Sequence, residues 1–320
     1  MSSRHARGVA GGPTPAPGTA TADLHAHTLR SDGVLEPAEL VRQAADAGIR
    51  LFAIADHDNL AAYRELCAPG AGPLPAGLAL VPAVEINSIT HGIRLELSEG
   101  ELHMLGIGVD PDDAAFEAVL AAQRDARRIR FQLAVDKLRD IGKPIDEQLA
   151  VMDIATDGAL GRPTLGRAMM AAGYVESVDE AFRVWIGHGR PGYVARTGLD
   201  PVGAIHAIRA AGGLASLAHF AEAPARIGLL RDLIGEGLGG LETNHRSFDA
   251  DTRIAMARVA ANLKLVATGG SDYHGDNGPY AATHALLVMP DALVAGARAA
   301  IAETAWGQRT GFAAEAGAAA

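Results

Sequence analysis

The chain has 320 residues, of which 48% are apolar, and a formal net charge of −10 at pH 7. This length allows one large domain or two smaller ones, and the apolar fraction suffices for a substantial buried core. The acidic balance argues against a surface for long nucleic acid, which needs a broad basic face. It leaves room for a small phosphorylated ligand held by a few arginines.

Cysteine content and hydropathy bear on location. Cys67 is the only cysteine, so no internal disulfide can form, and we expect a reducing, cytoplasmic location. We expect Cys67 itself to be a small buried apolar residue. No apolar run approaches the length of a membrane span, and no apolar segment follows Arg4 and Arg7. The sequence therefore predicts neither a signal peptide nor a membrane partner.

Alternating strands and helices are predicted for the first third of the chain. Residues 1–21 are rich in Gly, Pro, Ala and Thr and are expected to form a disordered leader. A short strand carrying His25 and His27 follows. We expect further strands at 51–55, 78–86 and 102–109, helices at 36–47 and 60–67, and a hairpin or loop at 88–100.

This alternation stops in the middle of the chain and then resumes. Residues 111–197 are expected to form a helical insert subdomain. We interpret four arginines of its long helix, 113–140, as a solvated face from which one or two side chains reach a phosphate: Arg124, Arg127, Arg128 and Arg130. Strands are then expected at 214–218, 239–243 and 264–268. A last strand–helix unit, 284–304, precedes a flexible tail, 306–320.

Repeated strand–helix units over 22–110 and 198–305 predict a mainly parallel sheet with helices outside it. In such folds the functional groups lie at the C-terminal ends of the strands, and polar side chains follow most of the predicted strands here. His103 is the exception, because it comes early in its strand. An antiparallel fourth strand would bring His103 to the same rim.

Nine polar residues stand out as candidate metal ligands: His25, His27, Asp32, His57, Glu85, His103, His219, Asp272 and His274. His25 and His27 point to one face of their strand. Imidazoles and carboxylates without sulfur suit Zn²⁺, Mn²⁺ or Fe²⁺. Nine ligands exceed the four of one tetrahedral ion, which predicts two or three ions that share a bridging carboxylate. Clustered metals activate water and stabilise phosphoryl transfer, so the sequence predicts metal-assisted hydrolysis.

Six separate motifs resemble those of the PHP phosphoesterases, the polymerase and histidinol phosphatase superfamily. They are Asp23–Thr28 with Ser31–Gly33, Ala55–Asp58, Val84–Ile86, Glu101–His103, Ala218–His219 and Gly270–His274. Their order and approximate spacing agree with the family. The resemblance implies a distorted (β/α)₇ barrel with a helical insert and a trinuclear metal site.

The resemblance also implies a ligand set for each ion. His25, His27, Glu85 and Asp272 would hold the first. Glu85 would bridge to the second with His103 and His219, and Asp32, His57 and His274 would hold the third. A bridging hydroxide would then attack phosphorus. No ligand position is missing, which argues for an active enzyme, with Asp272 and His274 in the catalytic set.

The insert resembles the branch that hydrolyses nucleoside 3′,5′-bisphosphates or removes nucleotides from the 5′ end of short RNA. Arg162 and Arg190, each followed by proline, resemble arginines that hold substrate phosphate there. The chain has Thr164 where the branch often has histidine. Arginine is the expected residue because its planar fork binds phosphate oxygens in pairs.

Several other polar residues have two interpretations. Of Asp56 and Asp58, we expect one to orient His57 and the other to cap the next helix. His245 and Arg246 could hold substrate or form a salt bridge, and His245 could donate a proton to the leaving oxygen. We interpret His188 as a loop residue.

The sequence therefore predicts a cytoplasmic, metal-dependent phosphoesterase for a small nucleotide or short oligonucleotide. One alternative is a histidinol-phosphate phosphatase of the same fold. Another is a non-catalytic metal-binding or nucleotide-binding module, and a third is a proofreading domain of a polymerase. The substrate that is turned over discriminates among these.

Overall fold

The computed structural model describes residues 18–90, 101–152, 161–276 and 278–312. The expected leader falls outside the described residues as far as position 17, and so does most of the expected hairpin, at 91–100. The end of the leader is corrected, because Ala20 is buried and the Thr21 carbonyl accepts hydrogen bonds from Arg50 and Leu51. The ordered chain thus starts before the first strand.

Seven strands form one sheet in sequence order. They are β1 (Ala22–Asp23), β2 (Leu51–Ile54), β3 (Ala79–Ile89), β4 (Glu101–Ile107), β5 (Leu214–Leu217), β6 (Gly240–His245) and β7 (Val266–Gly270). All neighbouring strands are parallel except β4, which is antiparallel to β3 and to β5. The predicted antiparallel fourth strand is therefore confirmed.

The first and last strands meet and nearly close the sheet into a barrel. The Leu24 amide donates to the Gly269 carbonyl at 3.1 Å. Beyond β1, Ala26 forms an isolated parallel bridge with Tyr273. This closure confirms the predicted distorted (β/α)₇ barrel. It also places the first and last strands side by side.

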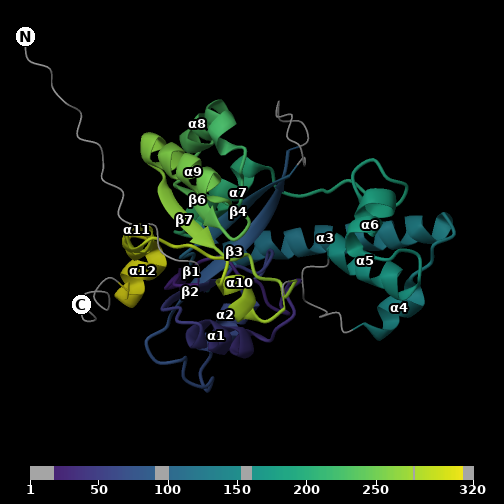
Figure 1. Cartoon of the computed structure of the whole chain (residues 1–320), viewed down its shortest axis with the longest axis horizontal. Coiled ribbons are helices and arrows are strands. Elements are labelled where there is room, and N and C mark those ends of the chain that lie inside the picture. Colours follow the sequence, from purple (N-terminus) through teal and green to yellow (C-terminus); the bar gives the residue numbers. More distant parts are fainter. Residues whose placement is uncertain (1–17, 91–100, 153–160, 277, 313–320) are drawn as a thin grey trace, which may run out of the picture.

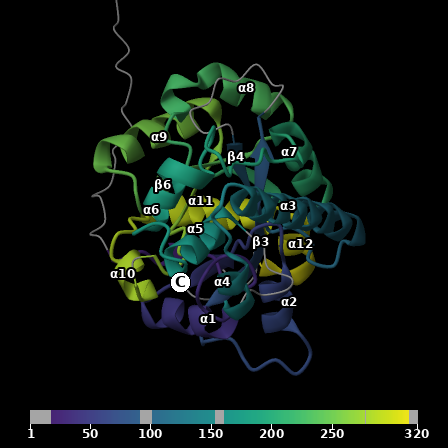
Figure 2. The same cartoon turned by 90° about the vertical axis from the view of Figure 1, so that its right-hand side faces the viewer.

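Helices surround the barrel (Figure 1, Figure 2). They are α1 (Pro37–Asp46), α2 (Ala61–Cys67), α7 (Pro201–Ala210), α8 (Ile227–Gly235), α9 (Ala250–Leu263), α10 (Tyr280–His284), α11 (Asp291–Ala302) and α12 (Ala305–Thr310), with the 3₁₀ turn η2 (Ala223–Ala225). Several starts are capped as their sequences suggest: the Asp200 side chain accepts from the Gly203 amide, and Asp249 accepts from Thr252. In the described part of the chain, no helix combines the length and apolarity that a bilayer requires.

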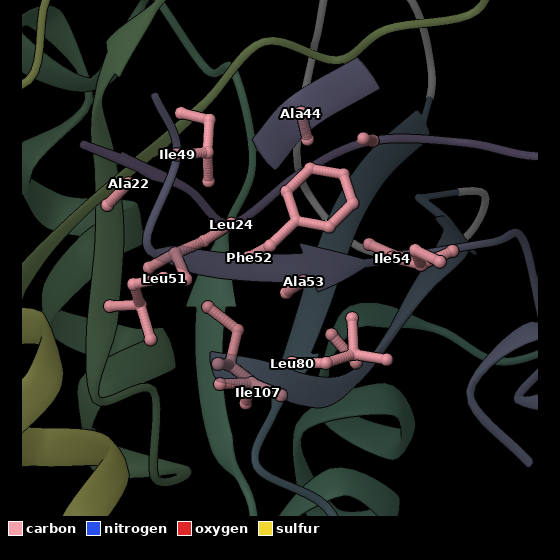
Figure 3. Packing of buried hydrophobic residues seen from close by; sticks show 14 of the residues in the cluster. Ala22, Leu24, Ala44, Ile49, Leu51, Phe52, Ala53, Ile54, Leu80 and Ile107 are labelled. Atoms are coloured by element: carbon pink, nitrogen blue, oxygen red, sulfur yellow. The ribbon is translucent and has the colours of Figure 1, made fainter. Parts of the chain in front are cut away.

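The barrel core consists of apolar side chains of the strands and small residues of the surrounding helices. All four residues of β2 are buried, as expected for a parallel strand covered on both faces. In Figure 3 the ring of Phe52 points toward Ala44, on the opposite side of β2 from Leu80 and Ile107, and all four belong to one apolar cluster. Complete burial of a side chain such as Phe52 contributes about 1.5–3 kcal/mol, so this cluster anchors the strands that carry the polar rim.

The expected last strand after His284 is wrong. Helix α10 ends there, and among the described residues the chain reaches α11 without another strand. The apolar run still serves the core, because Leu287 and Met289 are buried and the Val288 carbonyl accepts from the Asn244 side chain at 2.6 Å. The physical reason is closure: β7 already pairs with the chain near β1, which leaves no free edge.

The expected flexible tail is also corrected. Residues Ala305–Thr310 form α12, whose first turn is capped by the Thr304 side chain. Trp306 is buried, and its indole N–H donates to the Tyr63 hydroxyl at 3.0 Å. One buried aromatic side chain thus anchors a segment whose Ala/Gly-rich composition suggested a tail.

The helices of residues 111–197 form a group of their own beside the barrel. They are α3 (Ala114–Asp140), α4 (Asp146–Val151), α5 (Arg162–Ala171), α6 (Val178–Ala181) and the π-helical turn η1 (Phe182–Ile186). Figure 1 shows α3 running from the barrel into this group. Phe116 and Leu120 of α3 pack in a second apolar cluster of the barrel, with residues of β4, α7 and α9. Phe131 and Leu138 pack with the other insert helices. A single helix thus joins the two cores.

Candidate metal centre

The structure brings all nine candidate ligands together at one rim of the barrel. Three groups of side chains present ligand atoms within 4.8 Å of one another: His25, His27, Glu85 and Asp272; Glu85, His103 and His219; and His27, Asp32, His57 and His274. These groups match the sets that the resemblance implied, with His27 added to the last. Strand order explains the assembly, since the ligands all lie at one end of the barrel. His25 and His27 follow β1 rather than lying in it as expected, and His103 lies near the start of the antiparallel β4.

The first group has the spacing of a tetrahedral site. His25 Nε2 lies 3.4 Å from Glu85 Oε2 and 3.4 Å from Asp272 Oδ1. His27 Nε2 lies 3.3 Å from each of the same two oxygens. Zn–N and Zn–O bonds of the usual length place tetrahedral ligands about 3.3–3.6 Å apart. The four atoms therefore fit around one ion.

Glu85 joins the first group to the second. Its Oε2 faces His25 and His27, whereas its Oε1 lies 2.7 Å from His103 Nδ1 and 3.2 Å from His219 Nε2. The carboxylate is 1% exposed. With one oxygen toward each group, it is placed to bridge two ions.

The third group lies on the other side of His27. His274 Nε2 is 3.1 Å from Asp32 Oδ1, and His57 Nε2 is 3.7 Å from Asp32 Oδ2. The rings of His27 and His274 stack with centroids 4.0 Å apart. His274 is 24% exposed and His219 of the second group is 28% exposed, whereas His27 is fully buried, so the centre meets solvent at both of its outer groups.

The chemistry of these atoms fits divalent ions. Four buried candidate ligand atoms have no hydrogen-bond partner among the residues that the structure describes: His25 Nε2, His27 Nε2, Asp32 Oδ1 and His57 Nδ1. Buried polar atoms are normally paired, because leaving one unpaired costs about 1–3 kcal/mol. Here the unpaired lone pairs converge on shared points, which is the arrangement that a cation stabilises.

The electrostatics of the cluster favour ionised carboxylates. Burial alone would raise the pKa of Glu85, but the neighbouring His57, His103 and His25 imidazoles outweigh burial and hold that pKa well below its usual value. The pKa of Asp272 is likewise well below normal, because His25 and His274 outweigh its burial. Both groups are therefore anionic, as metal ligands must be.

Glu242, which the sequence analysis missed, supports two ligands at once. It is fully buried; its Oε1 lies 3.2 Å from His25 Nδ1, and its Oε2 accepts from the His219 amide at 2.6 Å. A carboxylate behind a ligating histidine fixes the ring and its tautomer. The available signal was a charged residue inside the apolar run of β6.

Backbone strain is concentrated at the rim. Four non-glycine residues in the described part of the chain have positive φ, and three of these flank or belong to the centre: Asp58, His219 and Asp272. Such conformations cost about 1–3 kcal/mol each and persist only where neighbours enforce them. The Asp272 amide donates to the His25 carbonyl at 2.6 Å. Gly270 permits this contact, because a Cβ there would lie 2.2 Å from the Cβ of His25.

The interpretations of Asp56 and Asp58 are both wrong. Asp56 accepts from the Thr28 amide at 2.7 Å, from the Thr28 hydroxyl at 2.6 Å and from the Ser31 hydroxyl at 2.5 Å. It therefore holds the loop that leads to Asp32, rather than orienting His57 or capping α2. Asp58 pairs instead with Arg127, whose Nε lies 2.6 Å from its Oδ2.

The interpretation of the α3 arginines as a solvated face is also corrected. Arg127 is 8% exposed and donates to Asn87 Oδ1 at 2.7 Å as well as to Asp58. Asn87 Nδ2 in turn lies 2.8 Å from His103 Nε2. Only Arg128 of the four is fully on the surface. Helical periodicity missed this because the partners come from strands distant in sequence.

Arg162 lies beside the centre, but Arg190 is not brought there. Arg162 Nη2 is 3.7 Å from Glu101 Oε1, and its guanidinium lies over the Phe182 ring. Arg190 is exposed, and its described hydrogen bonds are backbone contacts within its own turn, to Gly187 and Tyr193. Arg196, which the sequence analysis did not single out, is buried and donates to Glu101 Oε2 at 3.1 Å.

His245 and Arg246 have different partners. His245 Nδ1 accepts from the Ser247 amide at 3.2 Å, so its proton lies on Nε2, which is 3.5 Å from Asp272 Oδ2. Arg246 forms a paired salt bridge with the exposed Asp276. His188 lies in an exposed turn, as expected, whereas Cys67 is exposed rather than buried.

Comparisons with known proteins agree with this geometry, although no family model matches the chain. A 5′-3′ exoribonuclease of Haemophilus influenzae is 31% identical over 262 residues, which cover 79% of this chain and 89% of that protein. A 3′,5′-nucleoside bisphosphate phosphatase of Chromobacterium violaceum is 29% identical over 272 residues, covering 80% and 87%.

A solved structure also superimposes closely. A putative metal-dependent phosphoesterase from Bifidobacterium adolescentis has a TM-score of 0.74 and 29% identity, and the match covers 91% of this chain and 98% of that one. The fold, the cluster of candidate ligands at the barrel rim and the similarity to these proteins all support the same family. The chain belongs to the PHP superfamily of metal-dependent phosphoesterases, in the branch of these exoribonucleases and nucleoside bisphosphate phosphatases.

Proposed function

We propose that this enzyme hydrolyses phosphate esters of small nucleotides, either a nucleoside 3′,5′-bisphosphate or a short 5′-phosphorylated oligonucleotide. The observation that carries the proposal is the adjacency of two anion-binding features. Three groups of candidate metal ligands lie near one buried and two partly buried arginines, which outnumber their shared carboxylate partner, Glu101. A substrate with two phosphates suits this pair of features.

Two or three divalent ions, of Mn²⁺, Zn²⁺ or Fe²⁺, would be held by the nine ligands. When bound, such ions lower the pKa of a water molecule and neutralise charge on phosphoryl oxygens. Glu85 is placed to bridge two of the positions, and Asp272 to complete the first. His274, the exposed ligand of the third group, lies where the ester would enter.

The remaining residues would orient the substrate and the leaving group. Arg162 begins its helix next to the centre: a Cβ on the preceding Gly161 would lie 3.8 Å from Asp32 Oδ2, and Arg162 Nη2 is 3.7 Å from Glu101 Oε1. His245 holds its Nε2 proton beside Asp272 Oδ2. We propose this proton as the one available to the leaving oxygen, and Arg162 as a ligand of the second phosphate.

The test is turnover with Mn²⁺ of adenosine 3′,5′-bisphosphate, a 5′-phosphorylated RNA dinucleotide and histidinol phosphate in parallel. We expect release of phosphate from the bisphosphate, of a nucleotide from the dinucleotide, or both. Turnover of histidinol phosphate alone would assign the chain to the rival phosphatase. Turnover of none, with metal bound, would refute the proposed substrate class.

A ligand variant and a matched control test the centre itself. Asp272→Asn should lose bound metal and lower kcat/KM by more than about 100-fold, the upper end of effects seen for residues behind a ligand. Asp276→Asn makes the same charge change at an exposed residue four positions away and should leave both quantities unchanged. Full metal content in Asp272→Asn would contradict the ligand assignment.

A further inference from the structure

Glu101 lies where three guanidinium groups converge, between the insert and the metal centre. Its Oε2 accepts from Arg196 Nη1 at 3.1 Å. Its Oε1 lies 3.7 Å from Arg162 Nη2 and 3.9 Å from Arg130 Nη2. The Glu101 side chain is 14% exposed, so water screens these charges only partly.

The three arginines are not equally satisfied. Only Arg196 is within hydrogen-bond distance of Glu101, and it is the most buried of the three, at 6% exposure. Arg130 Nη2 is buried and has no hydrogen-bond partner in the described part of the chain. One carboxylate thus faces three cations, and two of the guanidinium groups keep donors that it does not reach.

The position of Glu101 relates it directly to the catalytic rim. Its Oε2 is 3.9 Å from His103 Nε2, on the ring whose Nδ1 faces Glu85. Guanidinium N–H groups without a carboxylate partner suit the oxygens of an anion, which accept charge-assisted hydrogen bonds.

We propose that Glu101 is a counter-anion that weakens phosphate binding, with its carboxylate near Arg130 and Arg162 where the second phosphate of the substrate would bind. This inference rests on the proposed function. In the free enzyme Glu101 reduces the mutual repulsion of the arginines. On binding, a phosphate supplies an acceptor for Arg130 Nη2, which has none among the described residues, and pairs with the partly exposed Arg162, while Arg196 stays paired with Glu101.

A consequence for selectivity follows. A ligand anion must approach Arg130 and Arg162 against the negative charge of Glu101, which costs affinity. This repulsion grows with the negative charge of the ligand and is absent for a neutral one. Glu101 thus lowers the affinity for substrates with a second phosphate relative to those without one.

The experiment measures binding of AMP and of adenosine to the metal-loaded enzyme by calorimetry. AMP carries the phosphate that remains after the proposed reaction. Glu101→Gln removes the charge and keeps the shape, so it should tighten AMP binding by about five- to tenfold, the scale of one partly screened charge pair. Adenosine binding should not change. Glu101→Asp, which keeps the charge, should behave like the natural enzyme.

Two further variants make the result specific. Arg162→Met should abolish the gain in AMP affinity from Glu101→Gln, because the guanidinium group that binds the phosphate is then absent. Glu117→Gln removes another carboxylate held by two arginines, Arg64 and Arg124, and should leave AMP binding unchanged. Unchanged or weaker AMP binding by Glu101→Gln would overturn the inference, and so would a gain that persists in Arg162→Met.

The failure of this inference and that of the proposed function are distinguishable. Turnover of the bisphosphate without any gain in AMP affinity leaves the function intact and refutes the role of Glu101. Tighter AMP binding without turnover of any nucleotide supports the anion site and refutes the proposed substrate.

Discussion

Substituting Arg127 tests whether one buried ion pair connects the insert helix to the metal centre. Arg127 is 8% exposed and its partner Asp58 is 1% exposed, with 2.6 Å between Nε and Oδ2. Arg127→Met keeps the length and helix propensity of the side chain but removes the charge. Asp58 would then be a buried carboxylate without its partner, and the Asn87 oxygen would lose a donor.

The magnitude follows from burial. Breaking a buried ion pair by removing one partner costs about 3–5 kcal/mol, because the remaining charge stays desolvated. We expect this loss in the free energy of unfolding, measured by urea titration of the chelator-treated protein. Metal content should fall as well, since Asp58 adjoins His57 and Asn87 contacts His103.

Two controls make the measurement decisive. Arg128→Met alters the next residue of the same helix, which is 57% exposed and pairs with Asp125, and should cost no more than about 0.5 kcal/mol. Asp58→Asn added to Arg127→Met should restore part of the stability, because no buried charge is left unpaired. If Arg127→Met is as stable as Arg128→Met, the ion pair does not stabilise the rim.

Two further predictions concern metal binding. Glu242→Gln should weaken metal affinity by about 10–100-fold in competition with a chelator, whereas Glu236→Gln, which alters an exposed carboxylate paired with His206, should not; equal affinities would refute the role of Glu242. In the metal-free protein, burial lowers the pKa of His274, but Asp32 and Asp272 outweigh it and raise that pKa to about 10. His274 is therefore protonated at neutral pH. Metal binding must displace this proton, so affinity should rise with pH. Calorimetry in buffers of different ionisation enthalpy would detect the released proton, and heats independent of the buffer would contradict the prediction.

The candidate site was largely accessible from the sequence because metal ligands follow apolar strands in a regular order. His57, His219 and Asp272 each come two or three residues after the end of a strand, and parallel strands bring such positions to one rim. His103 required one additional inference, the reversed direction of β4, which the strand pairing bears out.

The supporting residues were not accessible in this way, because their roles depend on partners distant in sequence. Glu242 contacts His25 across 217 residues, and Arg127 contacts Asp58 across 69. Neither pattern nor propensity encodes which buried charge meets which. The same limit explains why a last strand after His284 was wrongly predicted. Pairing of the chain near β1 with β7 left no free sheet edge for it.

The sequence by itself determined the class of chemistry: the imidazoles, the carboxylates and their order along an alternating chain. Only the tertiary structure decided how that chemistry is supported. Barrel closure gives Glu85 a group of ligands at each oxygen, and α3 carries Arg127 to the rim. The physical reason is that local sequence sets periodicity and ligand type, whereas charge pairing and strain are settled by which segments meet when the barrel closes.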